Sequence, residues 1–371
     1  MRSTSDIERG LPQRLSRFLA NQRKRPDGER IGSALEEIIK CGLLRTEFIR
    51  DAVTPRIDAP LMFFFLVALG RGDLSVARLY EGHVNALQLI ARLGTEPQLI
   101  RASETAASGG LLGVWGADDP SKPARLSQID GGFRLSGRKT FASGADRVAL
   151  ALVAAKNNDK KTQLCLLPSE ILNRRFDSSW WQPLGMQATN SFALDLDGID
   201  IGSSEMIGSA GDYETQPFFG AGAIRYVAAQ LGGALALWDA TRDHLALSGR
   251  FENPHQAARL GEMVADLEAA FSSVKNAYER AAYAINWDSL PDESCAFGAD
   301  SARVIVERMS ERILTLAIRS VGCAGLMDSH PLAAACRDLM VYLRQPAPDA
   351  ALARLGMYAC AGSYRPVFDE T

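Results

Sequence analysis

The stretch from Gly131 to Gly144, GGFRLSGRKTFASG, is the most informative part of the sequence. A turn at Asp130-Gly131-Gly132 leads into a strand, because Gly and Asp favour turn conformations and an apolar-polar alternation follows. Gly137-Arg138-Lys139 interrupts the strand, and Thr140-Phe141-Ala142-Ser143-Gly144 completes the segment. A strand, a glycine break and a polar-aromatic end predict a β-rich region at this point of the chain.

The same character extends over residues 110–215. Clusters of Gly, Pro, Asn and Asp separate short apolar runs, which predicts a middle domain built as an antiparallel β-barrel or sandwich. The predicted strands are Leu111–Trp115, Gly132–Gly137, Val148–Ala155, Gln163–Leu167 and Ser191–Leu196.

Helical patterns lie on both sides of this region. Residues 1–109 form a predicted N-terminal helical domain, in which Asp73 to Arg92 carries one apolar stripe between a capping Asp73 and a terminating Gly94. Residues 216–371 form a predicted C-terminal helical bundle, with one helix beginning at Pro254 after Asn253 as its cap. The order of helices, strands and helices predicts an α+β fold of three domains.

Composition excludes several classes of function. The chain has 371 residues, and 41 Lys and Arg nearly balance 44 Asp and Glu, so there is no bulk attraction to nucleic acid or anionic lipid. No apolar signal segment opens the sequence, and its most apolar run, 59–70, is shorter than the ~20 residues of a membrane span. A cytoplasmic protein without membrane or nucleic-acid partners is expected.

With this layout, the GGFRLSGRKTFASG segment resembles the acyl-CoA dehydrogenase family of flavoproteins. Four further motifs resemble the family in the same order: Gly185–Ser191 (GMQATNS), Gly249-Arg250-Phe251 with His255-Gln256-Ala257, Val321–Gly325 (VGCAG) and Arg337-Asp338. The resemblance covers roughly residues 30–350 and implies a C-terminal four-helix bundle, an FAD cofactor and a homodimer or homotetramer. No GxGxxG fingerprint is present, so a Rossmann-type dinucleotide site is not expected.

The resemblance also implies a flavin site. Phe141 would form a wall against one face of the flavin ring, and the hydroxyl or backbone N–H of Ser143 would reach its N5 or O4 atom. Backbone groups near Trp115 and Gly116 would hold the pyrimidine edge. An ordinary strand end without a ligand is the alternative for Phe141 and Ser143.

Other residues are assigned by the same resemblance. Arg250 from a neighbouring subunit would bind the FAD pyrophosphate, to which a multi-donor guanidinium is suited, and Gln256 and Arg319 would assist it. Tyr213 and Arg225 would line the acyl end of the substrate pocket. A solvated arginine after a helix end and a loop at a domain junction are the alternatives. No metal ligands are predicted.

The sequence departs from the family where catalysis requires a base. A dehydrogenase of this type removes an α-proton with a glutamate, and its two usual positions hold Pro346 and Ile224 here. Asp349 is a candidate replacement, with a plain loop aspartate as the alternative.

Three functions therefore compete. The first is an FAD-dependent oxidoreductase of the CH–CH type acting on an acyl thioester, carried by CoA or an acyl carrier protein, or on a related small molecule. The second is a flavin-dependent monooxygenase supplied by a flavin reductase, and the third is a catalytically degenerate flavin-binding or interaction protein. An electron-transfer partner or a reductase is expected for the first two.

Overall fold

The computed structural model describes residues 10–47, 61–215, 218–286, 293–345 and 347–362. These residues form two compact units, which both draw on the N-terminal part of the chain. The helical unit comprises the described residues within 1–20, 54–74 and 219–371, and the sheet unit those within 21–53 and 75–218. The division into domains 1–109, 110–215 and 216–371 remains a prediction.

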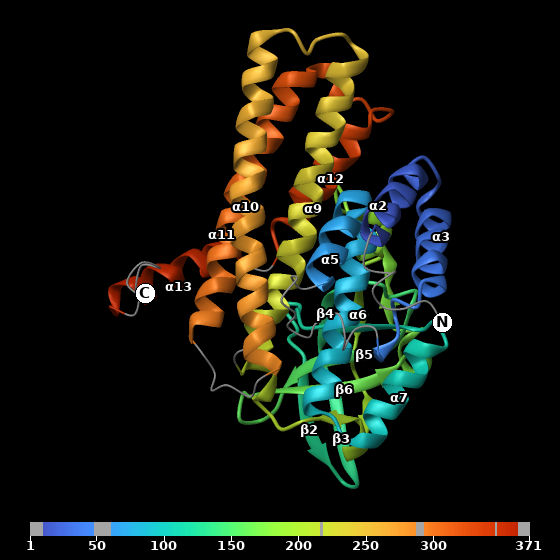
Figure 1. The fold of residues 1–371 in the computed structure, drawn as a ribbon. Coiled ribbons are helices and arrows are strands. Elements are labelled where there is room, and N and C mark those ends of the chain that lie inside the picture. The colour runs from blue at the N-terminus through green and yellow to red at the C-terminus, as the bar shows by residue number, and fades with distance from the viewer. Residues whose placement is uncertain (1–9, 48–60, 216–217, 287–292, 346, 363–371) are drawn as a thin grey trace. The chain divides into compact units, whose positions relative to one another are not determined.

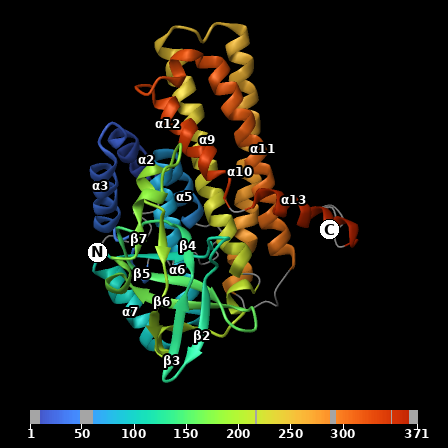
Figure 2. The ribbon, with the colours of Figure 1, turned by 180° about the vertical axis from the view of Figure 1, so that it is seen from behind.

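Long helices make up the helical unit (Figure 1). Its elements are α2 (Leu11–Gln22), α5 (Leu61–Gly72), α9 (Phe218–Leu247), α10 (Pro254–Asn286), α11 (Glu293–Val321), the turn η5 (Cys323–Leu326), α12 (Pro331–Tyr342) and α13 (Pro348–Cys360). The long helices α9, α10 and α11 run side by side, with α12 beside the upper part of α11 (Figures 1 and 2). The predicted C-terminal helical bundle is therefore confirmed.

Local sequence explains where α10 starts. The Asn253 side chain accepts hydrogen bonds from the backbone N–H groups of His255 at 3.0 Å and Gln256 at 3.3 Å. Pro254, which lacks an N–H, stands in the first turn, where no intrahelical partner is lost. Gly249, with a φ of 65°, reverses the chain between α9 and α10. The predicted start of this helix is confirmed.

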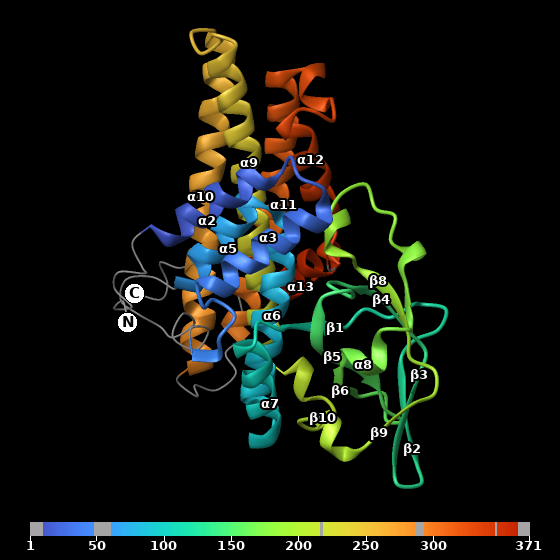
Figure 3. The same cartoon turned by 90° about the vertical axis from the view of Figure 1, so that its right-hand side faces the viewer.

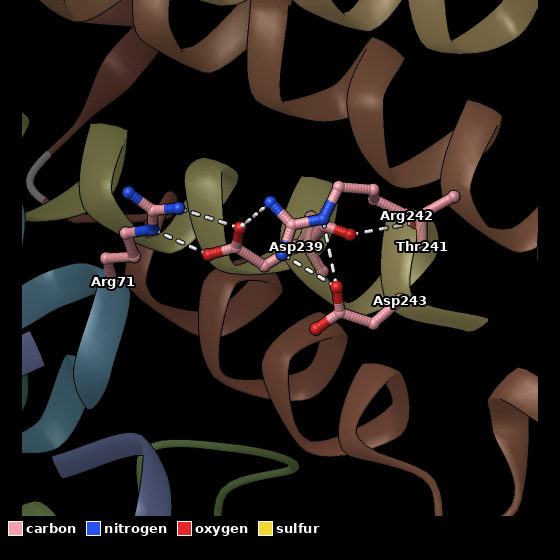
Figure 4. A network of polar contacts seen from close by, with 6 residues as sticks. Arg71, Asp239, Thr241, Arg242 and Asp243 are labelled. Atoms are coloured by element: carbon pink, nitrogen blue, oxygen red, sulfur yellow. Dashed lines mark hydrogen bonds and ion pairs between the residues drawn. The ribbon is translucent and has the colours of Figure 1, made fainter. Parts of the chain in front are cut away.

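Helices α5 and α9 pack at very short range. A Cβ atom at Gly70 would overlap the carbonyl oxygen of Ala229, and one at Gly232 would overlap that of Val67. Beside these glycines, Arg71 donates twice to Asp239, at 2.6 and 2.7 Å, and Arg242 adds a contact of 3.2 Å (Figure 4). Small residues bring the two backbones together, and the ion pair fixes one helix against the other.

In the described residues, the sheet unit combines strands with helices (Figure 3). The helices are α3 (Asp27–Lys40), α6 (Leu74–Leu93) and α7 (Glu96–Ala107), with a short α8 (Ser169–Leu172). The strands are β1 (Leu111–Trp115), β2 (Arg125–Ile129), β3 (Gly132–Ser136), β4 (Arg138–Ala142), β5 (Val148–Lys156), β6 (Thr162–Pro168), β7 (Phe176–Asp177), β8 (Phe192–Asp195), β9 (Ile199–Ile201) and β10 (Met206–Ile207). All five predicted strands are present within a few residues of their expected limits.

Two sheets are formed. The larger has the order β10-β6-β5-β2-β3-β9, with β1 also paired to β5, and the smaller has the order β4-β8-β7. Most pairs are antiparallel, as predicted for the middle region, while β1 and β2 pair with β5 in parallel. Strands that follow one another through a hairpin are antiparallel, whereas the chain between β1 and β5 returns to its starting end before β5 begins.

The α+β fold class is confirmed, and the predicted helix at 73–92 is found at 74–93, followed by Gly94. No helix in the described parts of the chain is both long and apolar enough to cross a membrane. The cytoplasmic location remains a prediction.

Candidate functional site

Phe141 is held in an unusual conformation at the end of β4. Its φ of 54° lies in the left-handed region, which is strained for an aromatic residue, and 43% of its surface is exposed. The pairing of β4 with β8 is irregular between Lys139 and Ala142, and this irregularity turns Phe141 outward. The Phe141 ring makes T-shaped contacts with the rings of Trp180 and Trp181, with ring centroids 4.9 and 6.1 Å apart. The sheet unit thus carries a partly exposed cluster of three aromatic rings.

Ser143 is the best-anchored residue next to this cluster. Its backbone N–H donates to the Phe141 carbonyl at 2.8 Å, and its own carbonyl accepts from the Trp115 indole N–H at 3.0 Å. Its hydroxyl lies 2.9 Å from that of Ser191, and Ser191 lies 2.7 Å from the Thr189 hydroxyl. Trp115, which is 2% exposed, therefore connects the end of β1 to the segment after β4.

Lys139 fixes the backbone that follows Trp115. The side chain is 1% exposed, and its ammonium donates to the carbonyls of Gly116 at 2.7 Å and Ala154 at 2.8 Å and to the Asp118 carboxylate at 2.6 Å. Burial lowers the pKa of Lys139, and the bond and charge of Asp118 oppose that shift. All three donors of the ammonium are used, so this lysine is a structural clamp.

Tyr213 comes close to the same loop. It stands in the turn η4 (Asp212–Glu214), whose start is tied to β6 by a hydrogen bond from Gly211 N–H to the Thr162 carbonyl at 2.8 Å. A Cβ atom at Gly116 would lie 3.6 Å from the Tyr213 hydroxyl. The structure therefore brings five of the predicted residues together within the sheet unit: Trp115, Gly116, Phe141, Ser143 and Tyr213.

A second group of predicted residues lies at one end of the helical unit. The Gln256 amide, oriented with its oxygen toward the guanidinium groups, accepts from Arg250 at 2.7 Å and Arg259 at 3.3 Å and donates to the Ser320 hydroxyl at 3.1 Å. Arg319 is exposed in the last turn of α11. Among the described residues, no carboxylate forms an ion pair with Arg250 or Arg259. Two cations that converge without an acidic partner are suited to an anion such as phosphate.

Arg225 lies far from this group. It is 4% exposed near the start of α9. Its charge acts on Tyr278 of α10: burial raises the pKa of Tyr278, and the Arg225 charge partly opposes that rise. At 1.5 Å per residue, the turns of α9 between Arg225 and Leu247 extend over about 33 Å. Arg225 therefore lies near the start of α9, and Arg250 follows the opposite end of the helix.

A sequence profile described as acyl-CoA dehydrogenase, C-terminal domain, matches residues 211–343. The whole chain also resembles solved structures. The chain has the acyl-CoA dehydrogenase-like fold. No curated protein sequence matches it.

Three structures illustrate this acyl-CoA dehydrogenase-like fold. TdsC from Paenibacillus sp. A11-2, in complex with FMN and indole, has a TM-score of 0.81 at 15% identity over 96% of this chain and 97% of that chain. KijD3, in complex with FMN and a dTDP-linked keto sugar, has a TM-score of 0.80 at 19% identity over 98% of this chain and 96% of that chain. Methanesulfinate monooxygenase MsuC from Pseudomonas fluorescens has a TM-score of 0.76 at 20% identity over 99% of each chain.

The two positions at which the family resemblance implies a base hold no acidic residue in the sequence. Ile224 is 1% exposed in α9, and Pro346 lies outside the described residues. Asp349 is exposed in the first turn of α13, where its charge faces solvent and favours the positive end of the helix dipole. Among the described residues, no three His, Cys, Asp or Glu side chains gather as a metal site would require.

Sequence reasoning missed several residues that shape these two groups. Thr189 and Ser191 stand inside the quoted GMQATNS motif, and Lys139 stands inside the GRKTFASG segment, so both motifs contained the signal. Trp180 and Trp181 are adjacent tryptophans beside a turn, which is a signal for an exposed aromatic surface. Arg259 had none, because its approach to Gln256 depends on the packing of α10.

Proposed function

We propose that the protein is a flavin-dependent monooxygenase that receives reduced flavin from a partner reductase. The observation that carries this proposal is Ile224, a buried aliphatic side chain at a position where dehydrogenases of this family hold a catalytic acid. Removal of an α-proton requires a base within hydrogen-bond reach, and isoleucine has none to offer. Insertion of oxygen makes no such demand.

The residues of the sheet unit fit an isoalloxazine ring. Phe141 and the two tryptophans offer an aromatic wall, and Tyr213, Ser143 and the backbone at Gly116 offer polar groups for the ring edge. When bound, a reduced flavin supplies the two electrons that activate oxygen. In the protein, Trp115 would hold Ser143 in place and Lys139 would hold the Gly116 carbonyl away from the ligand.

The similar structures support the same reaction class. TdsC is described as a dibenzothiophene monooxygenase and MsuC as a methanesulfinate monooxygenase. Structures of TdsC and KijD3 contain FMN. The substrate would be a small organic molecule.

A second candidate is an FAD-dependent oxidoreductase that acts on an acyl thioester of CoA or a carrier protein. The cluster of Arg250, Arg259 and Gln256 favours it, because two guanidinium groups with no acidic partner among the described residues suit the pyrophosphate that FAD has and FMN lacks. Since α9 separates Arg225 from Arg250 by about 33 Å, the two arginines of one chain would serve different molecules. A homodimer or homotetramer, in which Arg250 serves a neighbour's cofactor, accounts for this separation.

One pair of assays separates these functions. The purified protein is loaded with FMN or FAD, mixed anaerobically with acyl-CoAs, and then supplied with oxygen, NADH and a flavin reductase. If the protein is a monooxygenase, acyl-CoAs should not bleach the flavin. Oxygen consumption should then exceed the background of the reductase, and the excess should depend on an added substrate. Bleaching by an acyl-CoA would support the dehydrogenase instead, and a protein that binds neither flavin would be a degenerate scaffold.

A further inference from the structure

Three buried hydroxyl groups form a chain in the sheet unit. Thr189 is 1% exposed, Ser191 2% and Ser143 6%. The hydroxyls of Ser143 and Ser191 are 2.9 Å apart, those of Ser191 and Thr189 are 2.7 Å apart, and the Thr189 hydroxyl lies 2.8 Å from the Met186 carbonyl oxygen.

The carbonyl at the end fixes the direction of every bond in this chain. A carbonyl oxygen can only accept, so Thr189 gives its single hydroxyl hydrogen to Met186. Ser191 must then donate to Thr189, and Ser143 must donate to Ser191. The proton of each hydroxyl points away from Ser143, toward Met186.

No donor of Ser143 remains for a ligand. Its hydroxyl hydrogen is directed to Ser191, and its backbone N–H is bonded to the Phe141 carbonyl at 2.8 Å. Its carbonyl is occupied by the Trp115 indole at 3.0 Å. The hydroxyl oxygen keeps a lone pair, and no hydrogen of Ser143 is left to donate, so toward a ligand this residue is an acceptor.

We infer that Ser143 makes the site selective for reduced flavin by accepting the N5–H group, a donor that the ring carries only in its reduced form. The inference rests on the proposed flavin function. Oxidised flavin has acceptors at N5 and O4, and an acceptor-only serine makes no hydrogen bond to either. Ser191 and Thr189 act as positioning residues, because they set the direction of the Ser143 hydroxyl.

The test compares dissociation constants for oxidised and anaerobically reduced FMN or FAD. Ser143→Ala removes the acceptor, so binding of reduced flavin weakens by roughly 2- to 12-fold, the range for one hydrogen bond, while binding of oxidised flavin is unchanged.

Thr189→Val should change the binding of oxidised flavin, which Ser143→Ala leaves unchanged. Without the Thr189 hydroxyl, Ser191 turns its hydrogen to Ser143, and the Ser143 hydroxyl becomes a donor to the ligand. Oxidised flavin then binds more tightly and reduced flavin more weakly. The Met186 carbonyl keeps the Thr189 backbone N–H at 3.1 Å, so the variant leaves no buried acceptor unpaired. Ser191→Ala tests the same release of Ser143 independently.

Thr241→Val is the matched control. Thr241 is also buried and also donates to a carbonyl, that of Leu237 at 2.8 Å, but it lies in α9. The Thr241→Val variant should leave the dissociation constants for oxidised and reduced flavin unchanged. If Ser143→Ala weakens both redox forms equally, or if Thr189→Val fails to strengthen the binding of oxidised flavin, the inference is wrong while the flavin function stands. A wild-type protein that binds neither redox form would overturn both.

Discussion

The imidazole of His83 accepts a hydrogen bond from the backbone N–H of Leu112 at 3.0 Å, at the second residue of β1. Its other nitrogen lies 2.8 Å from the Leu44 carbonyl, so the proton is on Nε2 and the ring is neutral. Since the ring is fully buried, burial lowers the pKa of His83 to about 4, against a smaller opposing effect of the Leu44 bond. A second proton would bind at Nδ1, where it would meet the Leu112 N–H and break that hydrogen bond.

Acid should therefore destabilise the protein through His83. Unfolded histidine titrates near 6.5, so between pH 6.5 and about 4 the unfolded chain binds more protons than the folded one. The contribution of His83 to the free energy of unfolding is fully present above this window and is lost as the pH falls through it. The loss is about 2 kcal/mol between pH 7 and pH 5. Urea unfolding at both pH values measures the loss.

His83→Gln should reduce that pH dependence, although it lowers stability at neutral pH. His255→Ala is the control, because His255 is exposed and should keep the wild-type dependence. Equal pH dependence in His83→Gln and wild type would exclude His83 as the origin.

Replacing the clamp lysine should destabilise the sheet unit. Lys139→Met removes three hydrogen bonds and leaves Asp118 and two carbonyls without their donor, at a cost of about 2–4 kcal/mol. Lys122→Met is the control, since Lys122 pairs with two aspartates, Asp195 and Asp197, but lies on the exposed surface. Chemical denaturation should show a large loss for the first variant and no measurable loss for the second.

The close approach of α5 and α9 should not tolerate a methyl group. In Gly232→Ala the new Cβ would overlap the Val67 carbonyl oxygen and lie 2.7 Å from the Arg71 nitrogen, so we expect a loss of about 2–3 kcal/mol. Gly261→Ala on α10 should instead add roughly 0.5–1 kcal/mol, because nothing lies within 4 Å and alanine favours a helix. In thermal melting, the midpoint should fall for Gly232→Ala and rise for Gly261→Ala.

The phosphate assignment of Arg250 can be tested without catalysis. Arg250→Ala should weaken FAD binding by roughly tenfold or more, the value of a charge-assisted bond, and leave FMN binding unchanged. Arg312→Ala is the control, because Arg312 is exposed on α11 and already paired with Glu262 and Asp266. A loss of FMN and FAD affinity alike would argue against a pyrophosphate contact.

Much of the fold could be predicted from the sequence, since apolar periodicity and turn residues mark most elements. The strand at Leu111–Trp115 and the helix start at Pro254 are examples, because each is set by local residues. Strand β4 was missed because Arg138 and Lys139 give it a polar beginning, and the burial of Lys139 depends on acceptors from two distant segments. Parallel pairing of β1 with β5 also depends on chain path, which local pattern does not encode.

The candidate site was predictable only in part. Phe141 and Ser143 are two residues apart, so one motif identified both, and Tyr213 joined them through the family resemblance. What Ser143 can offer a ligand was not predictable, because its donors are occupied by Ser191 and Phe141 in the folded chain. The roles of these residues in binding remain predictions.

The length of α9 has a consequence for how the protein keeps its cofactor. With about 33 Å of α9 between Arg225 and Leu247, a dinucleotide whose phosphates needed Arg250 would take that residue from a second chain under the proposal above. Retention of FAD would then follow mass action between protomers: concentrated protein would hold it, and dilution below the dissociation constant of the protomers would release it. FMN, without the second phosphate, would be indifferent to dilution.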